Sequence, residues 1–426
     1  MTDFFKDKNL LALYPADDSG FPIRFDPLKK YFRSVHSLNY AHACHTEGIK
    51  NTECRIRSEI PDKKIDIVFC CPFASDYQLS VDFYASLRKE ARLVFWFADD
   101  PAYFESYDRY YAQTADAVIT SDYFIAFAYN RLEIPSLVYQ ELTPSNRCGP
   151  VKTDKDLDVC FIGDMRKRGR REYIEFLRTA GINVTVYGQG SANGYLPSEK
   201  ISEYICRSKI NLNFSQLSDL DWKNSDEPLL NRVRQNTGKP REIAISGAFC
   251  LSEYSPALST MFKPGEEIDF FRNKEELLEK VRFYLANPGK RDALALAAHE
   301  YAVKNYREEV YTQRMLEDLA AQLTDAGGAN IQTGRLYLSH GFKVREINSL
   351  TFSMCVMLKN LRPWYAFQTF LLLFKNGASA FISGFFGGIL RVMRNVLSKG
   401  ATKAKGISGS GTLRLILSAW PLIPNK

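Results

Sequence analysis

Acidic residues are missing from the C-terminal part of the chain. Glu346 is the last Asp or Glu of the 426 residues, and ten Lys and Arg follow it. Removing those ten from the 56 basic residues leaves 46 against 49 acidic ones, so residues 1–346 carry a net charge of −3 and the tail accounts for the overall +7. These ten charges lie far apart and lack the interleaved aromatics of a nucleic-acid-binding surface, so we expect no nucleic-acid partner.

Paired cysteines, histidines and long apolar runs are also scarce. Nine cysteines include no Cys-x-x-Cys pair, and the adjacent Cys70 and Cys71 lie within an apolar run, which indicates a reducing compartment. There are only five histidines, and the pair His42 and His45 has no second pair of ligands nearby, so we expect no metal site. The N-terminus lacks the basic and apolar regions of a signal peptide, which favours a cytoplasmic location.

Short apolar runs alternate with helical patterns over the first 145 residues. Apolar residues of strand length occur at 10–14, 65–71, 93–97, 117–120 and 137–139. Helical spacing of apolar residues occurs at 77–89 and 123–132. This alternation is typical of parallel βαβ units, so we predict a Rossmann-like domain over residues 1–145.

The polar stretch 141–156, which holds two prolines and a glycine, indicates a hinge. After it the alternation resumes, with strands expected at 158–163, 182–188 and 210–214 and helices at 170–180, 198–207, 274–287 and within 290–323. We therefore predict a second Rossmann-like domain over residues 146–326, with ligands bound between the two domains at the carboxyl ends of the strands.

The stretch from Gln235 to Pro256 has the features of a binding site. It is a polar, basic loop followed by a short helical turn, a glycine at 247 and an apolar run of strand length. Glu242 is expected near the N-terminus of that helix, beside Lys239 and Arg241. Backbone N–H groups and the helix dipole favour an anion there, and phosphate fits.

The same stretch resembles the C-terminal motif of CgeB-like glycosyltransferases, relatives of the group 1 GT-B enzymes. The matching residues are Gln235, Gly238, Glu242, Ile243, Gly247, Phe249, Leu251 and Glu253. The chain departs from the pattern at Thr237, Lys239 and Arg241. Weaker matches occur at 95–101, 160–163, 210–214, 262–268 and 284–288, so the resemblance covers about residues 60–320 and nothing in the tail.

This resemblance implies an α/β GT-B fold, in which two Rossmann-like domains face each other across a cleft. The N-terminal domain would bind the acceptor and the C-terminal domain the nucleotide sugar. Glu242 would hold the ribose hydroxyls, although capping of the helix is the alternative role. We expect the donor site to include Gly163, Arg166, Lys167, Arg170, Arg171, Gly188, Asn213, Gln235, Lys239, Arg241, Glu242 and Gly247.

The loop from Gly163 to Arg171 is suited to a diphosphate. It holds five basic residues in the six positions from Arg166, and its glycine permits close approach. Solvated surface charge is the alternative for some of these side chains. Cations and a helix N-terminus can neutralise the phosphates without a metal, so we expect no cofactor beyond the donor substrate.

Asp99 and Asp100 follow the apolar strand predicted at 93–97 and precede a proline. At that edge of the sheet either carboxylate could accept the proton of an acceptor hydroxyl. Capping of the following helix competes with this catalytic role, and the sequence does not choose between the two residues.

The favoured function is therefore transfer of a sugar from a nucleotide-diphosphate sugar to a hydroxyl of a glycan or lipid-linked saccharide in surface polysaccharide synthesis. The departures at Thr237 and Arg241 motivate an alternative, a catalytically inactive GT-B scaffold or carbohydrate-binding protein in surface or coat assembly.

The tail at 327–426 has apolar stretches too short to span a bilayer. A helix over 378–399 would place Phe381, Phe385, Ile389, Met393 and Val396 on one face and basic residues on another. We expect residues 360–399 to lie on the anionic inner face of the membrane. Packing against the body and a kinked re-entrant segment are the alternatives, and the membrane interpretation predicts that both domains fold without the tail.

Overall fold

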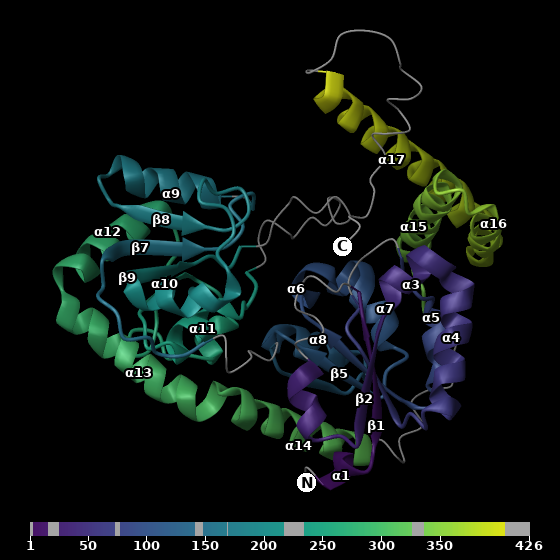
Figure 1. Ribbon diagram of the computed structural model, residues 1–426, viewed down its shortest axis with the longest axis horizontal. Helices are drawn as coiled ribbons and strands as arrows, with labels where there is room; N and C mark the ends of the chain where they lie inside the picture. Colours follow the sequence, from purple (N-terminus) through teal and green to yellow (C-terminus); the bar gives the residue numbers. More distant parts are fainter. Residues whose placement is uncertain are drawn as a thin grey trace.

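Two parallel β-sheets, one in each half of the chain, form the centres of two domains (Figure 1). The computed structural model describes residues 3–15, 25–72, 77–140, 148–167, 169–216, 234–325 and 336–404. Residues 141–147 of the predicted hinge lie outside these ranges. The alternation of strands and helices in each half confirms the prediction of two Rossmann-like domains.

The N-terminal sheet has six parallel strands in the order β2-β1-β3-β4-β5-β6. They are β1 (Asn9–Tyr14), β2 (Ser34–Asn39), β3 (Ile67–Cys70), β4 (Arg92–Phe97), β5 (Ala117–Thr120) and β6 (Ser136–Val138). Five of them coincide with the predicted apolar runs. Sequence analysis missed β2, because this edge strand is polar and only partly buried.

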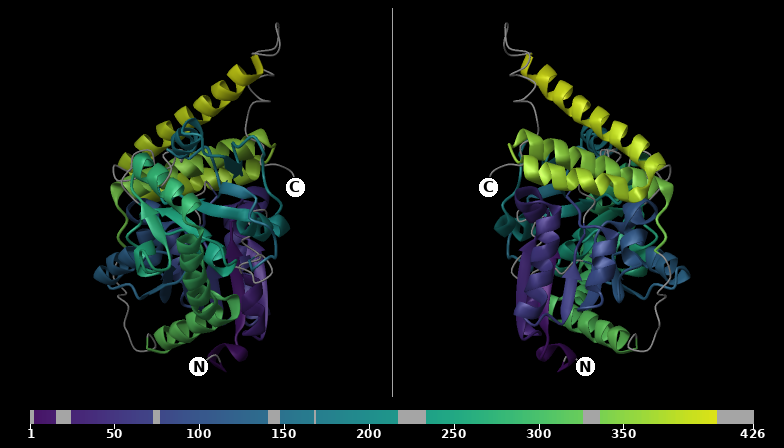
Figure 2. Two further views of the ribbon diagram at one scale, coloured as in Figure 1. Left: turned by 90° about the vertical axis from the view of Figure 1, so that its left-hand side faces the viewer. Right: turned by 90° about the vertical axis from the view of Figure 1, so that its right-hand side faces the viewer.

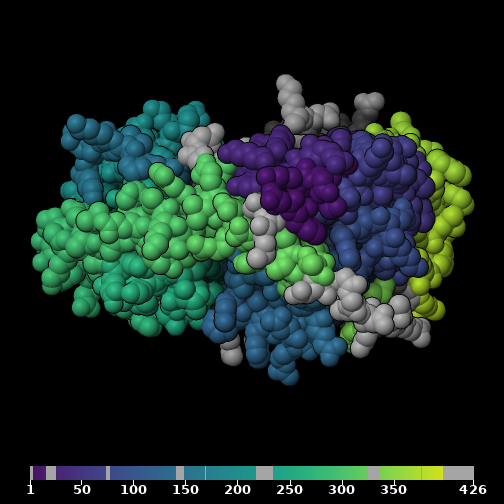
Figure 3. Space-filling view, turned by 90° about the horizontal axis from the view of Figure 1, so that it is seen from below, coloured from purple at the N-terminus to yellow at the C-terminus, as the bar shows by residue number. Residues whose placement is uncertain are grey.

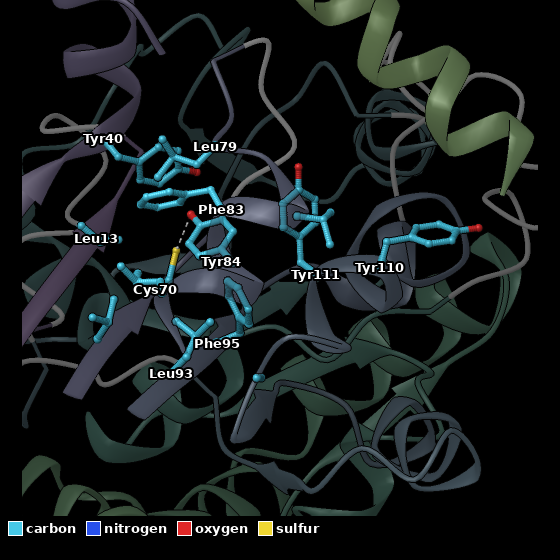
Figure 4. Close-up of a cluster of buried hydrophobic side chains, with 14 of the residues drawn as sticks. Leu13, Tyr40, Cys70, Leu79, Phe83, Tyr84, Leu93, Phe95, Tyr110 and Tyr111 are labelled. Carbon is cyan, nitrogen blue, oxygen red and sulfur yellow. Dashed lines mark hydrogen bonds between the residues drawn. The ribbon is translucent and has the colours of Figure 1, made fainter. Parts of the chain in front are cut away.

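Alternate residues of these strands enter two separate cores. Leu11 and Leu13 pack on one face with α3 (Tyr40–Glu47), α4 (Ile49–Asp62) and α5 (Val81–Leu87). Leu10 and Ala12 pack on the other face with α1 (Asp3–Lys6) and the 3₁₀ turn Asp26–Lys30. Figure 4 shows the first core, where Cys70 Sγ lies 3.2 Å from the Tyr84 hydroxyl.

The C-terminal sheet has five parallel strands in the order β11-β10-β9-β7-β8. They are β7 (Leu157–Ile162), β8 (Val184–Tyr187), β9 (Ser208–Asn213), β10 (Cys250–Glu253) and β11 (Asp269–Phe271). Its helices are α9 (Arg170–Thr179), α10 (Ile201–Arg207), α11 (Lys239–Ile245), α12 (Lys274–Ala286) and α13 (Pro288–Tyr306). β7, β8, β9 and β10 coincide with predicted strands or apolar runs, whereas β11, a three-residue strand that begins with Asp269, was not predicted.

The chain returns to the N-terminal domain through α14 (Glu308–Asp325). Figures 1 and 3 show α13 and α14 as a continuous band from one domain to the other. Met315, Leu316 and Leu319 of α14 are fully buried in the second N-terminal core. The segment that we predicted as the end of the C-terminal domain therefore packs against the N-terminal sheet.

The tail forms three helices: α15 (His340–Lys359), α16 (Pro363–Leu372) and α17 (Ala378–Ala404). Figures 1 and 2 show α15 and α16 along the N-terminal domain, on the side away from the C-terminal domain, and α17 rising from them away from the body. Phe342, Ile347 and Leu350 of α15 belong to the first N-terminal core. Packing against the body, which was an alternative interpretation, therefore holds for α15.

Helix α17 packs against α15 through glycines. A Cβ atom on Gly384 would lie 2.6 Å from the Val344 carbonyl oxygen, and one on Gly388 would lie 2.6 Å from Thr351 Cβ. This close packing turns Phe381 and Phe385, which we expected on a membrane, toward the body, where they pack against the first core. No helix within the described ranges is long and apolar enough to span a bilayer.

Candidate functional site

Asp99 and Asp100 lie at the carboxyl end of β4, where α6 (Asp100–Tyr103) begins. Asp99 is the N-cap residue by position, but its side chain makes no capping hydrogen bond. Asp99 Oδ1 instead accepts a hydrogen bond from Nε2 of Gln235 in the C-terminal domain. The same amide lies 3.4 Å from the Ala98 carbonyl oxygen. Asp99 therefore faces the other domain.

Asp100 points into the N-terminal domain. Its side chain is fully buried, and Ser121 Oγ donates to its Oδ1 at 3.4 Å. Burial raises the pKa of Asp100 well above its usual range, and the carboxylates of Asp122 and Asp99 raise it further. Burial therefore favours the protonated form of this carboxyl, which does not reach the opposite domain.

Two desolvated cations follow β7 in the C-terminal domain. Arg170 begins α9, is only 8% exposed, and donates from Nη1 to the Asp164 carbonyl oxygen at 3.1 Å. Its guanidinium lies 5.4 Å from the Phe161 ring centroid, and its Nε has no hydrogen-bond partner among the described residues. Burial lowers the pKa of Arg170 to about 10.

Lys167 lies within the same loop and is half-buried. Burial lowers its pKa, the positive charge of Arg170 lowers it further, and the Asp99 carboxylate opposes both effects. Lys167 and Arg170 thus lie together in the loop and first turn of helix that follow β7. Buried cations without a full complement of partners at a helix N-terminus attract an anion.

Arg166 and Arg171 are more exposed and hold the neighbouring loop. Arg166 forms an ion pair with Asp164 at 2.8 Å and donates to Gln189 Oε1 at 2.5 Å, and Arg171 Nη2 donates to the Gly190 carbonyl oxygen at 3.4 Å. Both residues thus support the turn after β8.

Gly163 and Gly188 lie side by side at the ends of β7 and β8. Gly188 has a φ of +120°, and a Cβ atom there would lie 2.2 Å from the Gly163 carbonyl oxygen. A Cβ atom on Gly163 would lie 2.6 Å from the Phe161 ring. Close approach of two backbones therefore explains both glycines.

Asn213 and Gln235 connect the strand ends. Asn213 is buried at the end of β9, where its Nδ2 donates to Ser252 Oγ at 2.9 Å and its Oδ1 accepts from Thr237 Oγ1 at 2.9 Å. Thr237, one of the departures from the family pattern, thereby fixes the loop that carries Gln235. This arrangement points the Gln235 amide at Asp99.

The predicted residues of α11 have different environments. Lys239 and Glu242 form an ion pair and are both partly exposed. Arg241 is 1% exposed, and its guanidinium stacks 5.0 Å from the Tyr311 ring of α14. Gly247, with a φ of +74°, ends α11 at the opposite terminus from Lys239. Arg241 and Gly247 hold α11 in place, and their roles in donor binding remain predictions.

Glu253 is a site residue to which sequence analysis assigned no role. It ends β10, is 3% exposed, and accepts the backbone N–H groups of Ser215 and Gln216 at 3.0 and 2.8 Å. Its other oxygen pairs with Arg234 Nε at 3.2 Å. Glu253 thus holds together the two ends of the segment 217–233, which lies outside the described residues. The match of Glu253 to the family pattern was the available signal.

Metal-ligand clusters are not found in the part of the chain that the structure describes, where no three His, Cys, Asp or Glu side chains lie close enough together to hold an ion. His45, one of the histidine pair, instead packs edge-on against Tyr77 with ring centroids 5.1 Å apart. All nine cysteines are free thiols.

Residues 166–319 match a protein family described as glycosyl transferase-like. The match begins in the basic loop after β7 and ends within α14, so it covers the candidate donor-binding residues after Gly163. No curated protein is similar enough to the chain to count as a match.

Several solved structures share the arrangement of the two domains. HepE from Anabaena in complex with UDP and glucose is 11% identical, with a TM-score of 0.54 over 73% of this chain and 99% of that one. A glycosyltransferase from Rickettsia africae is 11% identical, with a TM-score of 0.56 over 75% and 99%. Sucrose-phosphate synthase from Thermosynechococcus elongatus is 12% identical, with a TM-score of 0.54 over 75% and 100%. The chain has the GT-B fold, as predicted.

Proposed function

We propose that the protein is a glycosyltransferase that moves a sugar from a nucleotide-diphosphate sugar to a hydroxyl group of an acceptor. The observation that carries this proposal is the hydrogen bond between Asp99 and Gln235 across the two domains, together with the buried Arg170 at the start of α9 in the C-terminal domain. The N-terminal domain thus contributes the Asp99 carboxylate, and the C-terminal domain contributes the cations Lys167 and Arg170, which are suited to bind a diphosphate. The family match over 166–319 and the GT-B fold support the proposal.

In the proposed reaction, Lys167, Arg170 and the N-terminus of α9 bind the diphosphate of the donor. Glu242 accepts hydrogen bonds from the ribose hydroxyls, in exchange for its ion pair with Lys239. The acceptor oxygen forms a bond to the anomeric carbon while the bond from that carbon to the diphosphate breaks. Asp99 takes the proton of the acceptor hydroxyl, and the cations stabilise the charge of the departing diphosphate.

No metal takes part in this proposal, because buried cations and backbone N–H groups neutralise the phosphates. Closure of the domains around the donor excludes water that would hydrolyse it. The hydrogen bond from Gln235 to Asp99 joins the two domains, and we propose that it helps to hold them closed.

We further propose that the acceptor is a glycan or lipid-linked saccharide used in surface polysaccharide synthesis. The chain would work in the cytoplasm, attached peripherally to the inner face of the membrane through residues 360–399. Nine free thiols are consistent with a reducing compartment.

An experiment with nucleotide sugars tests the enzymatic proposal. The purified protein is incubated with UDP-, GDP-, ADP- and dTDP-sugars, with and without EDTA, and release or transfer of the sugar is followed. We expect turnover of at least one donor, unaffected by EDTA and lost in Glu242→Ala. No turnover of any donor with a lipid-linked or free glycan acceptor would refute the proposal.

A non-catalytic scaffold is the second candidate, favoured by the burial of Arg241 against Tyr311 and by the ion pair that occupies Glu242. It predicts that glycans bind without nucleotide-dependent transfer. Sugar transfer that is lost in both Glu242→Ala and Asp99→Asn would exclude the scaffold.

A further inference from the structure

An exposed apolar surface covers the outer sides of α16 and α17. Eight large side chains contribute, each between 50% and 62% exposed: Trp364, Phe367, Leu371, Phe374, Ile382, Phe386, Leu390 and Met393. We call these eight residues the apolar ridge. Their spacing of three or four residues places the members on one face of each helix. The opposite face of α17, with Gly384, Gly388 and Val392, is buried.

Ring contacts join the two helices of the ridge into one surface. Phe374, in the 3₁₀ turn Leu373–Asn376 that follows α16, stacks on Phe381 with centroids 4.8 Å apart, and Phe381 stacks on Phe385 at 5.4 Å. Phe385 in turn lies 6.1 Å from Phe386. Large continuous apolar surfaces of this kind mark sites of interaction, in contrast to single exposed residues.

The charge around the apolar ridge indicates which kind of partner binds it. Residues 347–404 contain seven Lys and Arg and no Asp or Glu, and two of these cations are engaged by the body: Lys375 pairs with Asp82 at 2.6 Å, and Arg362 donates to the His45 carbonyl oxygen at 2.9 Å. Arg394 on α17 is exposed. A second copy of this surface would bring like charges together, which disfavours self-association. A bilayer with anionic lipids satisfies both features, because the apolar side chains enter the interface and the cations attract the headgroups.

We propose that the apolar ridge is a membrane-docking surface that holds the N-terminal domain against an anionic bilayer. This face differs from the one predicted by helical spacing alone, because Phe381 and Phe385 turn toward the body. Helices α15 and α16 lie on the side of the N-terminal domain away from the C-terminal domain, and α17 rises from them above the body (Figure 1). The ridge therefore belongs to the N-terminal half of the molecule.

The consequence for the acceptor rests on the proposed function. If the N-terminal domain binds the acceptor, docking by the ridge confines that domain to the surface that carries lipid-linked saccharides. The C-terminal domain meanwhile remains free to exchange nucleotide with solution. Docking itself requires no catalytic activity, so the two proposals can fail separately.

The test is sedimentation of the full chain with vesicles of phosphatidylcholine alone and of phosphatidylcholine mixed with phosphatidylglycerol. Two double variants, Phe367→Ser/Leu371→Ser and Phe386→Ser/Leu390→Ser, reduce the ridge on α16 and α17. A matched control, Tyr123→Ser/Phe127→Ser, removes two equally exposed aromatics from α8 (Tyr123–Arg131). Circular dichroism checks that each variant is folded.

We expect the full chain and the control to bind mixed vesicles better than neutral ones, and each ridge variant to lose roughly tenfold or more in partition. Vesicle binding that is the same in the ridge variants as in the native chain would overturn the inference. Loss of vesicle binding on removal of residues 405–426 alone would also overturn it. So would a ridge-dependent dimer that does not bind vesicles. Turnover of a nucleotide sugar, measured in parallel without vesicles, reports separately on the proposed function.

Discussion

Asp99 and Asp100 are neighbours in the sequence but have different surroundings. Asp99 faces Gln235 of the other domain, whereas Asp100 is fully buried beside Ser121. A general base must reach the substrate proton, and only Asp99 of the pair has that access. The structure thus separates two carboxylates that the sequence left equivalent.

Asp99→Asn keeps the acceptor atom for Gln235 but removes the base. We predict that kcat for sugar transfer falls by roughly 10²- to 10⁴-fold. Nucleotide affinity, measured by calorimetry, should change little. Asp62→Asn, at an exposed position of α4, is the control. An unchanged kcat in Asp99→Asn would remove Asp99 from the mechanism.

Asp100 makes stability depend on pH. Its pKa is raised in the folded state, so the folded protein retains a proton that the unfolded chain releases. Asp100 contributes its full stabilisation below the pKa that it has in the unfolded chain. This contribution is lost as the pH rises toward the pKa that it has in the folded protein. Asp100→Asn should therefore gain stability relative to the native chain as pH increases.

Urea unfolding at about pH 5 and about pH 8 measures this difference. We predict that the free energy of unfolding of Asp100→Asn minus that of the native chain is larger at the higher pH. Asp62→Asn should show no such trend. A difference independent of pH would mean that Asp100 is ionised in the folded protein.

At the scale of single residues, sequence patterns predicted the positions of the candidate site but not their environments. The basic loop and the Gln235 motif predicted Lys167, Arg170, Gln235 and Glu242 as donor-binding residues. Burial of Arg241 against Tyr311 depends on α14, which follows some 70 residues later. No local pattern carries such a contact.

The glycines of α17 govern how the tail helices pack. A side chain at Gly384 would clash with the Val344 carbonyl and with Ile347 Cβ at 2.7 Å, whereas one at Gly387 meets only the end of the Asn348 side chain. We predict that Gly384→Leu lowers the free energy of unfolding by about 1–3 kcal/mol. Gly387→Ala should be nearly neutral. Equal effects on thermal unfolding would contradict this packing.

Helix α15 ties the tail to the N-terminal core. The ring centroids of Phe342 and Tyr110 lie 4.4 Å apart, and the Tyr110 hydroxyl donates to Ser339 Oγ at 2.7 Å. A chain cut after residue 330 should therefore be less stable, since each lost apolar side chain contributes roughly 1.5–3 kcal/mol. This outcome is the reverse of the one that the sequence suggested.

Thermal unfolding of chains that end at 330 and at 404 tests this prediction. The chain ending at 404 keeps α15 to α17 and should unfold near the temperature of the full chain. If the chain ending at 330 is equally stable, α15 does not contribute to the N-terminal core.

At the scale of elements, apolar strands such as β1 and β3 were predicted well because every residue in them is buried. The polar edge strand β2 was missed, since its residues are largely half-exposed. Helical spacing predicted that α17 has an apolar face, but apolar residues occur on both sides of it. The glycines decide which side is buried, and their effect appears only when α15 is in place.

Across the whole molecule, the two domains are connected by α14 and by the contact of Gln235 with Asp99. Gln235→Ala removes this side-chain contact, so we predict a larger radius of gyration in small-angle scattering. Gln189→Ala, whose bond to Arg166 stays within the C-terminal domain, is the control. Identical scattering from both variants would mean that the contact does not hold the domains together.

Nucleotide binding at the buried cations is the central claim of this account. Calorimetric titration of the native chain with UDP, GDP, ADP, CMP and dTDP, repeated with Arg170→Gln and with the exposed Arg178→Gln of the same helix, tests it most directly. We predict that at least one nucleotide binds the native chain and the Arg178 variant, and that Arg170→Gln weakens binding by roughly tenfold or more. Binding of none of these nucleotides, or equal affinity in both variants, would contradict the account.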